Sequence, residues 1–285
     1  MWKFLNEKNF GYVFVLPWII GFIVFTAYPI FYSFYLSFFD VTFTATGIET
    51  YFIGIGNFHN AISTDIAFIR EVGQFSIMSA VAIPLIVIIA LTLALLLNHP
   101  IRARGTFRTI FFLPVIIASG PVIDKLMDMG ATTIPDMGRY QFYHLIQAGD
   151  NAFFSAIIFI LDNIIMLLWF SGVQILVFLA GLQKLDKEAY EAARVDGASS
   201  WEIFWKITLP SLSSLILVNI VYTTVMYAQT TLNPVIDIIS DNMFNIHTGF
   251  GYSSALAWLY FLVIILIMLA LLGIFVIFSR RSAKA

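Results

Sequence analysis

Cysteine and charge are what this sequence has least of. Its 285 residues include no cysteine, and only 11% are charged, whereas 60% are hydrophobic and the mean hydropathy is +0.90. The absence of cysteine excludes a disulfide scaffold, a cysteine-ligated zinc or iron–sulfur site and a cysteine nucleophile. Ordinary soluble domains carry roughly 25% charged residues. The scarcity of charge therefore predicts an integral membrane protein.

Motifs for metal binding and for nucleotide binding are also missing. The four histidines lie far apart and form no His-x-x-x-His pair, so we expect no metal site. No glycine-rich loop ending in Gly-Lys-Ser or Gly-Lys-Thr occurs, which is the usual device for holding nucleotide phosphates. No arrangement of residues indicates a catalytic site, and we expect no nucleic-acid partner.

Six charge-poor runs are long enough to cross a bilayer, which takes about 20 residues per helix. They predict an all-α protein with six transmembrane helices. The predicted spans are Phe10–Leu36, Gln74–Leu97, Thr109–Met129, Ile157–Leu182, Leu212–Ile236 and Tyr252–Phe278.

The basic residues are distributed unevenly between the two sides of this predicted topology. Twelve of the fifteen lysines and arginines fall on one side, which the positive-inside rule assigns to the cytoplasm together with both termini. We therefore expect a leading helix and outer loop in residues 1–73, a transmembrane core in 74–279 and a cytoplasmic tail in 280–285. We infer no role for the outer segment 130–151 from its sequence.

One polar cassette, Asp186–Pro210, lies on the cytoplasmic side between the fourth and fifth spans. Asp186 is a typical cap for a first helix, and Gly197 interrupts that helix. A second short amphipathic helix is predicted over Ser199–Lys206. Pro210 stands where the next span begins, because the first helical turn tolerates proline. The cassette is thus predicted to consist of two helices joined by a glycine turn.

Two interpretations of the cassette are open. It could be an amphipathic loop that lies on lipid headgroups, which is common in membrane proteins. Its acidic and basic residues nearly balance, however, whereas an anionic membrane favours a cationic face. Small alanines allow close approach, and Tyr190, Trp201 and Trp205 are typical interface anchors. These features favour a protein partner.

The cassette resembles the EAA loop of ABC-importer permeases, in the form found in carbohydrate permeases of the maltose type. The matching runs occur in register: Glu191-Ala192-Ala193, then Asp196-Gly197-Ala198, then Ile207-x-Leu209-Pro210. Three further stretches also resemble spans of such permeases: "FRTIFFLPV" at 107–115, "GVQILVFLAGLQ" at 172–183 and "GFGYSSALAWL" at 249–259.

This resemblance implies a type I ABC importer permease fold with a cytoplasmic coupling helix that docks on an ATPase. It implies two separate cytoplasmic ATPase subunits that hold ATP and Mg, so no cofactor is expected in this chain. It also implies an extracytoplasmic sugar-binding protein and a second related permease, although a homodimer would serve equally. The expected location is a bacterial or archaeal cell membrane, with lipid around the spans. The coupling residues that the resemblance implies are Glu191, Ala192, Ala193, Asp196 and Gly197.

The fifth predicted span is the most polar. Thr223, Tyr227 and Thr230 are spaced i, i+4, i+7 and share a helix face, with Asn219 one turn before them. Hydroxyls beside Met226 could bind a neutral sugar, since this span contains no lysine or arginine. Serine and threonine also pack helices together in membranes, and that alternative stays open. In similar permeases the sugar-contacting face falls on Thr223, Met226, Tyr227 and Thr230.

Three residues of the fourth span are further candidates for the substrate pathway. Trp169 and Gln174 could line it, although an aromatic near a span end is often an interface anchor. Asp162 is the only ionisable residue deep in a predicted span, a position that by default suggests function. It could be solvated or structural, contact substrate, or relay protons.

Together these features predict a permease subunit that forms half of the translocation pathway for a sugar or oligosaccharide. The alternative is a carrier or channel driven by an ion gradient. Such a protein would work without partners and would need buried charge, for which Asp162 is the only candidate. A structural membrane anchor would leave the polar face of the fifth span unexplained.

Overall fold

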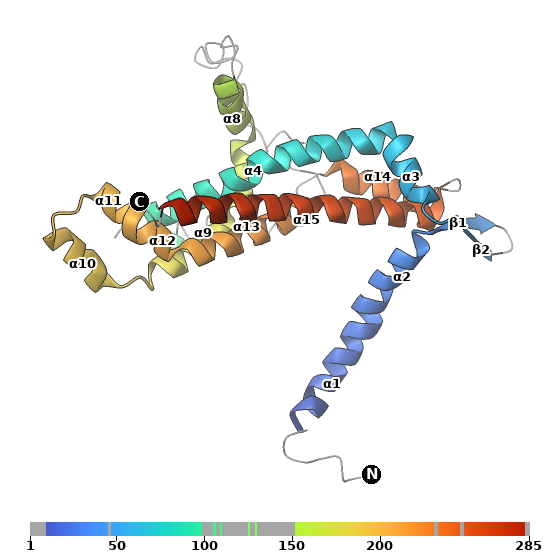
Figure 1. Cartoon of the computed structure of the whole chain (residues 1–285), viewed down its shortest axis with the longest axis horizontal. Helices are drawn as coiled ribbons and strands as arrows, with labels where there is room; N and C mark the ends of the chain where they lie inside the picture. Colours follow the sequence, from blue (N-terminus) through green and yellow to red (C-terminus); the bar gives the residue numbers. More distant parts are fainter. Residues whose placement is uncertain are drawn as a thin grey trace. The chain divides into compact units, whose positions relative to one another are not determined.

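The computed structural model describes residues 10–44, 47–98, 105–106, 109, 125, 129, 152–230, 233–245 and 248–282. The expected third span, Thr109–Met129, and the outer segment 130–151 lie almost entirely outside them. The described chain is mostly helical and divides into two compact units, residues 1–73 with 234–262 and residues 74–233 with 263–285 (Figure 1). The segment boundaries expected from the sequence stay predictions.

The first unit begins with one continuous helical run, which agrees with the expected first span. It comprises α1 (Phe10–Phe22), the π-helical turn η1 (Ile23–Ala27) and α2 (Tyr28–Leu36). Proline stands in the first turn of α2, directly after the π turn. Because proline lacks a backbone N–H and crowds the preceding turn, the wider π turn is a physical way to keep the run helical.

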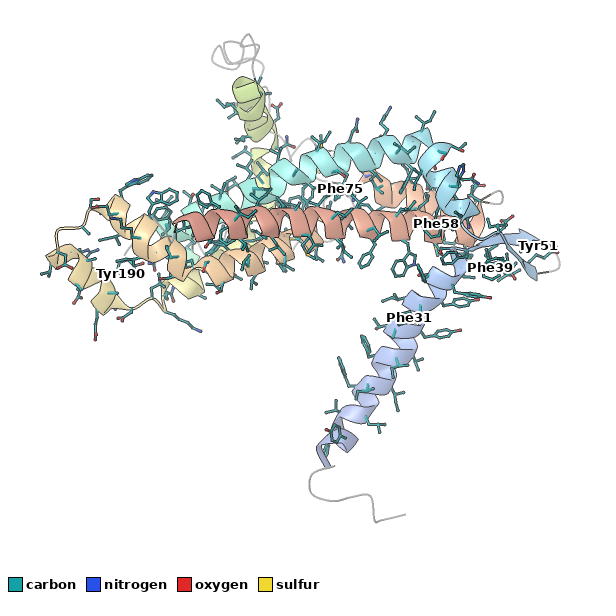
Figure 2. The ribbon with its side chains drawn as sticks, in the orientation of Figure 1. Phe31, Phe39, Tyr51, Phe58, Phe75 and Tyr190 are labelled. Atoms are coloured by element: carbon teal, nitrogen blue, oxygen red, sulfur yellow. The ribbon has the colours of Figure 1, made fainter. Side chains whose placement is uncertain are left out.

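A two-stranded hairpin follows, so the expectation of an all-α protein is wrong at this point. Strand β1 (Phe39–Thr44) pairs antiparallel with β2 (Gly47–Phe52), from Phe39 opposite Phe52 to Thr44 opposite Gly47. The rings of Phe39 and Phe52 meet across the strands, with centroids 5.2 Å apart. Aromatic cross-strand pairs of this kind stabilise short hairpins. Phe39 and Tyr51 mark the hairpin in Figure 2.

Hydrogen bonds join the remaining elements of this unit, which are α3 (Gly56–Ser63), the start of α4 (Ile66–Asn98), α14 (Pro234–Met243) and the start of α15 (Gly249–Ser282). The buried amide of Asn57 donates to the carbonyls of Ser37 and Phe39, at 3.0 and 2.9 Å. The indole N–H of Trp258 donates to the hydroxyl of Ser33, at 3.2 Å. The hydrogen bond of Trp258 therefore connects α15 to α2.

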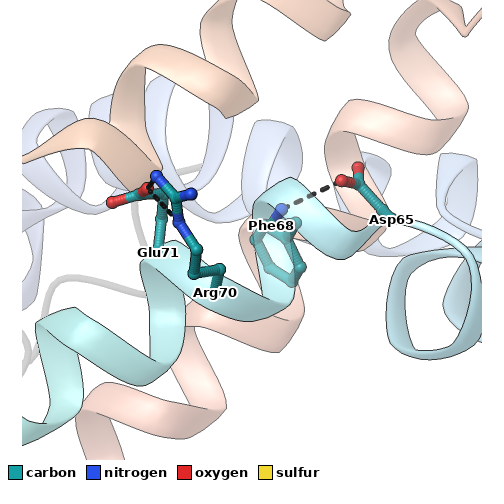
Figure 3. Close-up of polar contacts among 4 residues, drawn as sticks. All are labelled: Asp65, Phe68, Arg70 and Glu71. Atoms are coloured by element: carbon teal, nitrogen blue, oxygen red, sulfur yellow. Dashed lines mark hydrogen bonds and ion pairs between the residues drawn. The ribbon is translucent and has the colours of Figure 1, made fainter.

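Asp65 connects the start of α4 to α15 in the first unit. Its Oδ1 accepts a hydrogen bond from the backbone N–H of Phe68 at 2.9 Å, which caps the start of α4 (Figure 3). Its Oδ2 accepts a second bond of 2.9 Å from the hydroxyl of Tyr252 on α15. Arg70 and Glu71 form an ion pair of 3.1 Å in the next turn of α4.

The second unit holds most of α4, the end of α15, and the helices between residues 152 and 228. These are α8 (Ala152–Phe170), α9 (Gly172–Leu182), α10 (Lys187–Val195), α11 (Ser200–Ile203), the π turn η3 (Phe204–Thr208), α12 (Leu209–Ser211) and α13 (Ser213–Ala228). Helices α9 and α13 run side by side (Figure 1). Their shared apolar core includes Ile175, Phe178 and Leu179 of α9 with Leu212 and Ile216.

Three described helices are long and apolar enough to cross a membrane: Phe14–Leu36, Ile66–Asn98 and Gly249–Ser279. They confirm long apolar helices at the first, second and sixth predicted spans. Two bent pairs raise the number to five if each pair is one span. One pair joins Ile160–Phe170 to Gly172–Leu182 with a bend of 63°, and the other joins Ser200–Ser211 to Ser213–Ala228 with a bend of 64°.

The fourth and fifth predicted spans are therefore not straight helices. The fourth breaks at Ser171, and the fifth is preceded by a break at Leu212 and ends early, at Ala228. The second bend has two identifiable causes, because the π turn and Pro210 both interrupt regular helical hydrogen bonding just before it.

Candidate functional site

The cassette begins as the sequence predicts. Asp186 caps α10, and its Oδ1 accepts a hydrogen bond of 2.9 Å from the backbone N–H of Glu188. The helix ends in a turn in which Gly197 has φ = +82°. Ala198 N–H donates to the carbonyl of Ala193 at 2.9 Å, which closes the turn. A positive φ of this kind favours glycine over residues with a Cβ. The predicted helix and glycine turn are confirmed.

The second helix of the cassette starts with a capping box that the sequence analysis missed. The N–H of Ser199 donates to Glu202 Oε2 at 2.9 Å, and the N–H of Glu202 donates back to Ser199 Oγ at 3.3 Å. The signal was the Ser-x-x-Glu spacing. From there α11, η3 and α12 form one helical run to Ser211, in which Ile203 is buried.

The predicted coupling residues lie on α10 and its terminal turn. Ala193 is half-buried, and the other four are exposed: Glu191, Ala192, Asp196 and Gly197. A separate protein could reach this surface directly. Their contact with an ATPase stays a prediction.

Tyr190 departs from its expected role as an exposed anchor. It is half-buried, and its hydroxyl lies 2.7 Å from the hydroxyl of Thr208 in η3. Trp201, by contrast, is exposed, with its ring centroid 5.5 Å from that of Trp205. The aromatic residues of the cassette therefore serve different purposes, and Tyr190 links its two helices.

A buried polar cluster joins α9 to α13. The amide Nε2 of Gln174 donates to the hydroxyl of Thr223 at 2.8 Å, and both side chains are fully buried. Asn219, one turn earlier on α13, is also buried. The neighbouring Thr224 bonds instead to the carbonyl of Ile220 in its own helix, at 2.8 Å. Sequence spacing thus correctly placed Asn219 and Thr223 on one face, and the structure adds Gln174 to them.

Several polar atoms in this unit are buried without a hydrogen-bond partner among the described residues. They are Gln174 Oε1, both side-chain polar atoms of Asn219, Trp169 Nε1 and Ser79 Oγ. Such groups are uncommon in folded proteins, because an unpaired buried polar atom costs free energy. Donors and acceptors of this kind can bind a hydroxyl-rich molecule. Ser79 on α4 was not predicted, since a lone serine in an apolar span carries no sequence signal.

Tyr227 and Met226 lie beside an apolar cluster in the same unit. Both are half-buried against the core residues Ala82, Ile86, Leu167 and Phe170. The ring of Tyr227 is 6.0 Å from that of Phe75 and 5.8 Å from that of Phe170, measured between centroids. Phe75 is labelled on α4 in Figure 2. The ring of Tyr227 is therefore part of an aromatic group from three helices.

Thr230 does not share the helix face of Thr223 and Tyr227, so that prediction is wrong. Helix α13 ends at Ala228, two residues before it. The side chain of Asn233 ends the helix by donating to the carbonyl of Ala228 at 3.1 Å, and Pro234 then starts α14. Asp162 lies half-buried in α8. The substrate contacts expected of both residues stay predictions.

Comparison with known proteins identifies a matching family. Residues 67–284 match the family described as the binding-protein-dependent transport system inner membrane component. The chain is 30% identical to the probable ABC transporter permease protein YesP of Bacillus subtilis, over 92% of this chain and 88% of that protein. It is also 30% identical to the lactose transport system permease protein LacF of Rhizobium radiobacter, over 85% of this chain and 77% of that one.

A solved structure shares the fold. It is the crystal structure of a bacterial alginate ABC transporter in complex with an alginate pentasaccharide-bound periplasmic protein. One of its chains is 20% identical to this one, with a TM-score of 0.61 over 94% of both chains. The expected fold of an ABC transporter permease is confirmed at this level.

Proposed function

This chain belongs to the family of binding-protein-dependent transport system inner membrane components, and on that premise we propose that it forms half of the translocation pathway of an ATP-driven sugar importer. A separate cytoplasmic ATPase supplies the energy through the cassette. Membership of this family argues against a carrier driven by an ion gradient.

The observation that carries the proposal is the polar cluster of Gln174, Thr223 and Asn219. Its side chains are neutral, and three of their polar atoms are buried without a partner among the described residues. Tyr227, one turn beyond Thr223, adds an aromatic ring. Neutral hydrogen-bonding groups beside a ring suit a sugar, which has polar edges and apolar faces. Relatives named for lactose and for trehalose and maltose support this substrate class.

The proposed pathway extends to the other candidates of the fourth and fifth predicted spans. It includes Met226, Thr230, Trp169 and Asp162, with Asp162 as a substrate contact. The family name and the periplasmic protein bound in the related transporter support an extracytoplasmic sugar-binding protein as partner. We propose that a second related permease completes the pathway.

The energy source in this proposal is a pair of cytoplasmic ATPase subunits. They bind ATP and Mg, and this chain contributes no cofactor. The exposed surface of α10 supports docking there, through Glu191, Ala192, Ala193, Asp196 and Gly197. The proposal places six spans in a bacterial or archaeal cell membrane, with both termini in the cytoplasm.

The test is sugar uptake by the assembled transporter in proteoliposomes. Radiolabelled lactose, maltose and trehalose are offered with the binding protein outside, and ATP is supplied to the ATPase side. Uptake of at least one sugar should require ATP hydrolysis, and Tyr227→Ala should abolish or alter that uptake while the subunits still assemble. Tyr28→Ala is a matched control, because Tyr28 is exposed in α2. Uptake driven by an ion gradient without ATP hydrolysis would overturn the proposal, and unchanged uptake in Tyr227→Ala would remove this site.

A further inference from the structure

The hydroxyls of Tyr190 and Thr208 connect the two helices of the cassette. They lie 2.7 Å apart, although the two residues are 18 positions apart in the sequence. Thr208 Oγ1 also donates to the carbonyl of Ile203, at 3.4 Å. Because a threonine hydroxyl has one proton, this bond requires Tyr190 to donate to Thr208. A directed chain therefore leads from Tyr190 through Thr208 to the backbone of α11.

Among the described residues, few polar contacts hold α10 against the second helix. None of its residues is buried. In the described part of the chain, the Tyr190–Thr208 link is the one side-chain hydrogen bond from α10 to that helix, and the ion pair of the cassette, Lys206 with Glu202, stays within the second helix. The backbone connection between the two helices passes through the left-handed Gly197. Glycine leaves the angle between two helices poorly fixed, because its backbone is permissive.

Thr208 lies near the end of the cassette and connects it to the core of its unit. It is 5% exposed and is the last residue of the π turn. Its carbonyl accepts a hydrogen bond of 3.1 Å from the N–H of Leu212. Leu212 is buried in the apolar core that includes Phe178 and Leu179 of α9. A displacement that reaches Thr208 is therefore passed on to packed helices.

We propose that the Tyr190–Thr208 link fixes the angle of α10 to the second helix, so that α10, α12 and the head of α13 move together when the ATPase moves. Tyr190 is then a positioning residue for energy coupling and not a contact residue for the ATPase. This inference rests on the proposed function, because it takes α10 to be the docking helix. It assigns separate roles to two adjacent residues. Glu191 faces outward and contacts the ATPase, whereas Tyr190 faces inward and bonds to Thr208.

The first test measures the angle directly and needs no sugar. Since the chain lacks cysteine, Glu188→Cys and Ser214→Cys provide two exposed spin-label positions, in α10 and at the head of α13. Distances are measured by pulsed electron resonance in the complete transporter, assembled with cysteine-free partner subunits, without nucleotide and trapped with Mg-ATP and vanadate. We expect one narrow distance distribution in each state.

Removing either hydroxyl should broaden both distributions. Tyr190→Phe removes only the bond to Thr208, whereas Thr208→Val removes that bond and the bond to the carbonyl of Ile203. The double variant should therefore broaden the distributions no further than Thr208→Val alone. Thr208→Ser keeps the hydroxyl and should retain the narrow distributions. Tyr28→Phe and Thr92→Val are matched controls, since Tyr28 is exposed and the Thr92 hydroxyl bonds only within its own helix.

The second test measures coupling. In proteoliposomes, Tyr190→Phe should raise the number of ATP molecules hydrolysed per molecule of whichever labelled sugar, lactose, maltose or trehalose, the unaltered transporter imports. The inference is overturned if Tyr190→Phe leaves the distance distributions unchanged, or if the effects of the two single changes add in the double variant. Failure of the unaltered transporter to import any of the three sugars counts against the proposed substrates instead, because the distance measurement does not depend on them.

Discussion

Gln174 and Thr223 share a hydrogen bond of 2.8 Å, although 49 residues of chain separate them. Both are fully buried, and the bond joins the helices on either side of the cassette. Residues 175 to 222 thus form a closed loop that leaves the membrane core, passes through the cassette and returns. The bond fixes where the two arms of this loop meet.

Deleting the acceptor of this bond should destabilise the protein. Thr223→Val keeps the shape of the side chain but leaves the Gln174 amide buried without a partner, which costs about 1–3 kcal/mol. Thermal unfolding of the assembled transporter in nanodiscs should show a lowered midpoint. Thr224→Val is the control, because that hydroxyl bonds only to its own helix. This variant should lower the unfolding midpoint less than Thr223→Val does. An equal decrease in the midpoint for both variants would show that the hydrogen bond between the helices adds nothing to stability.

Gly251 should not tolerate a side chain. A Cβ at this position would overlap the carbonyl oxygen of Phe39, and a rigid backbone atom cannot move aside as a flexible side chain can. We expect Gly251→Ala to separate the start of α15 from the start of β1 and to reduce the yield of folded protein, as measured by gel filtration in detergent. Gly21→Ala and Gly73→Ala, where a Cβ meets nothing within 4 Å, should fold normally.

Replacing Asp65 should destabilise the start of α4 more than replacing its hydrogen-bond partner Tyr252. Tyr252→Phe removes one hydrogen bond, whereas Asp65→Ala also removes the cap on Phe68, and loss of such a cap costs about 0.5–2 kcal/mol. Hydrogen exchange should therefore show faster opening of the first turn of α4 in Asp65→Ala than in Tyr252→Phe. Similar exchange in both variants would contradict the assigned cap.

Gly197 allows backbone strain to be tested without steric overlap. Its φ is +82°, and a Cβ there would meet nothing within 4 Å. Gly197→Ala should cost about 1 kcal/mol through the left-handed conformation alone, and Gly197→Asn should cost less, because asparagine tolerates that region. We expect ATP-dependent sugar uptake to fall in the order glycine, asparagine, alanine while the subunits remain assembled. The reverse order for the two variants would show that strain is not the cause.

Local signals in the sequence predicted the cassette well. A capping aspartate at 186 and a turn glycine at 197 act through bonds to the next few residues, so tertiary packing has little influence on them. Hydropathy likewise located the long helices, because an apolar run about 20 residues long has few alternatives in a bilayer.

The breaks at Ser171 and Leu212 could not be predicted from hydropathy. A residue keeps its apolar character whether the backbone beside it is straight, bent or π-helical, so composition carries no signal for the bend. The prediction that Thr230 shares the helix face of Thr223 was wrong for a related reason. Asn233 ends the helix early through a hydrogen bond to the backbone of Ala228. Partners distant in the chain, such as Tyr190 with Thr208, are set by the fold.

The bend of 64° at Leu212 determines how the cassette can act on α13. An angle this close to perpendicular directs most of a displacement along the run Ser200–Ser211 across the axis of α13, and only the smaller part along it. A push from the cassette would therefore tilt α13 rather than slide it along its axis. Tilting about a point within the helix moves its two ends in opposite directions, so the end of α13 that carries Tyr227 would move against the push.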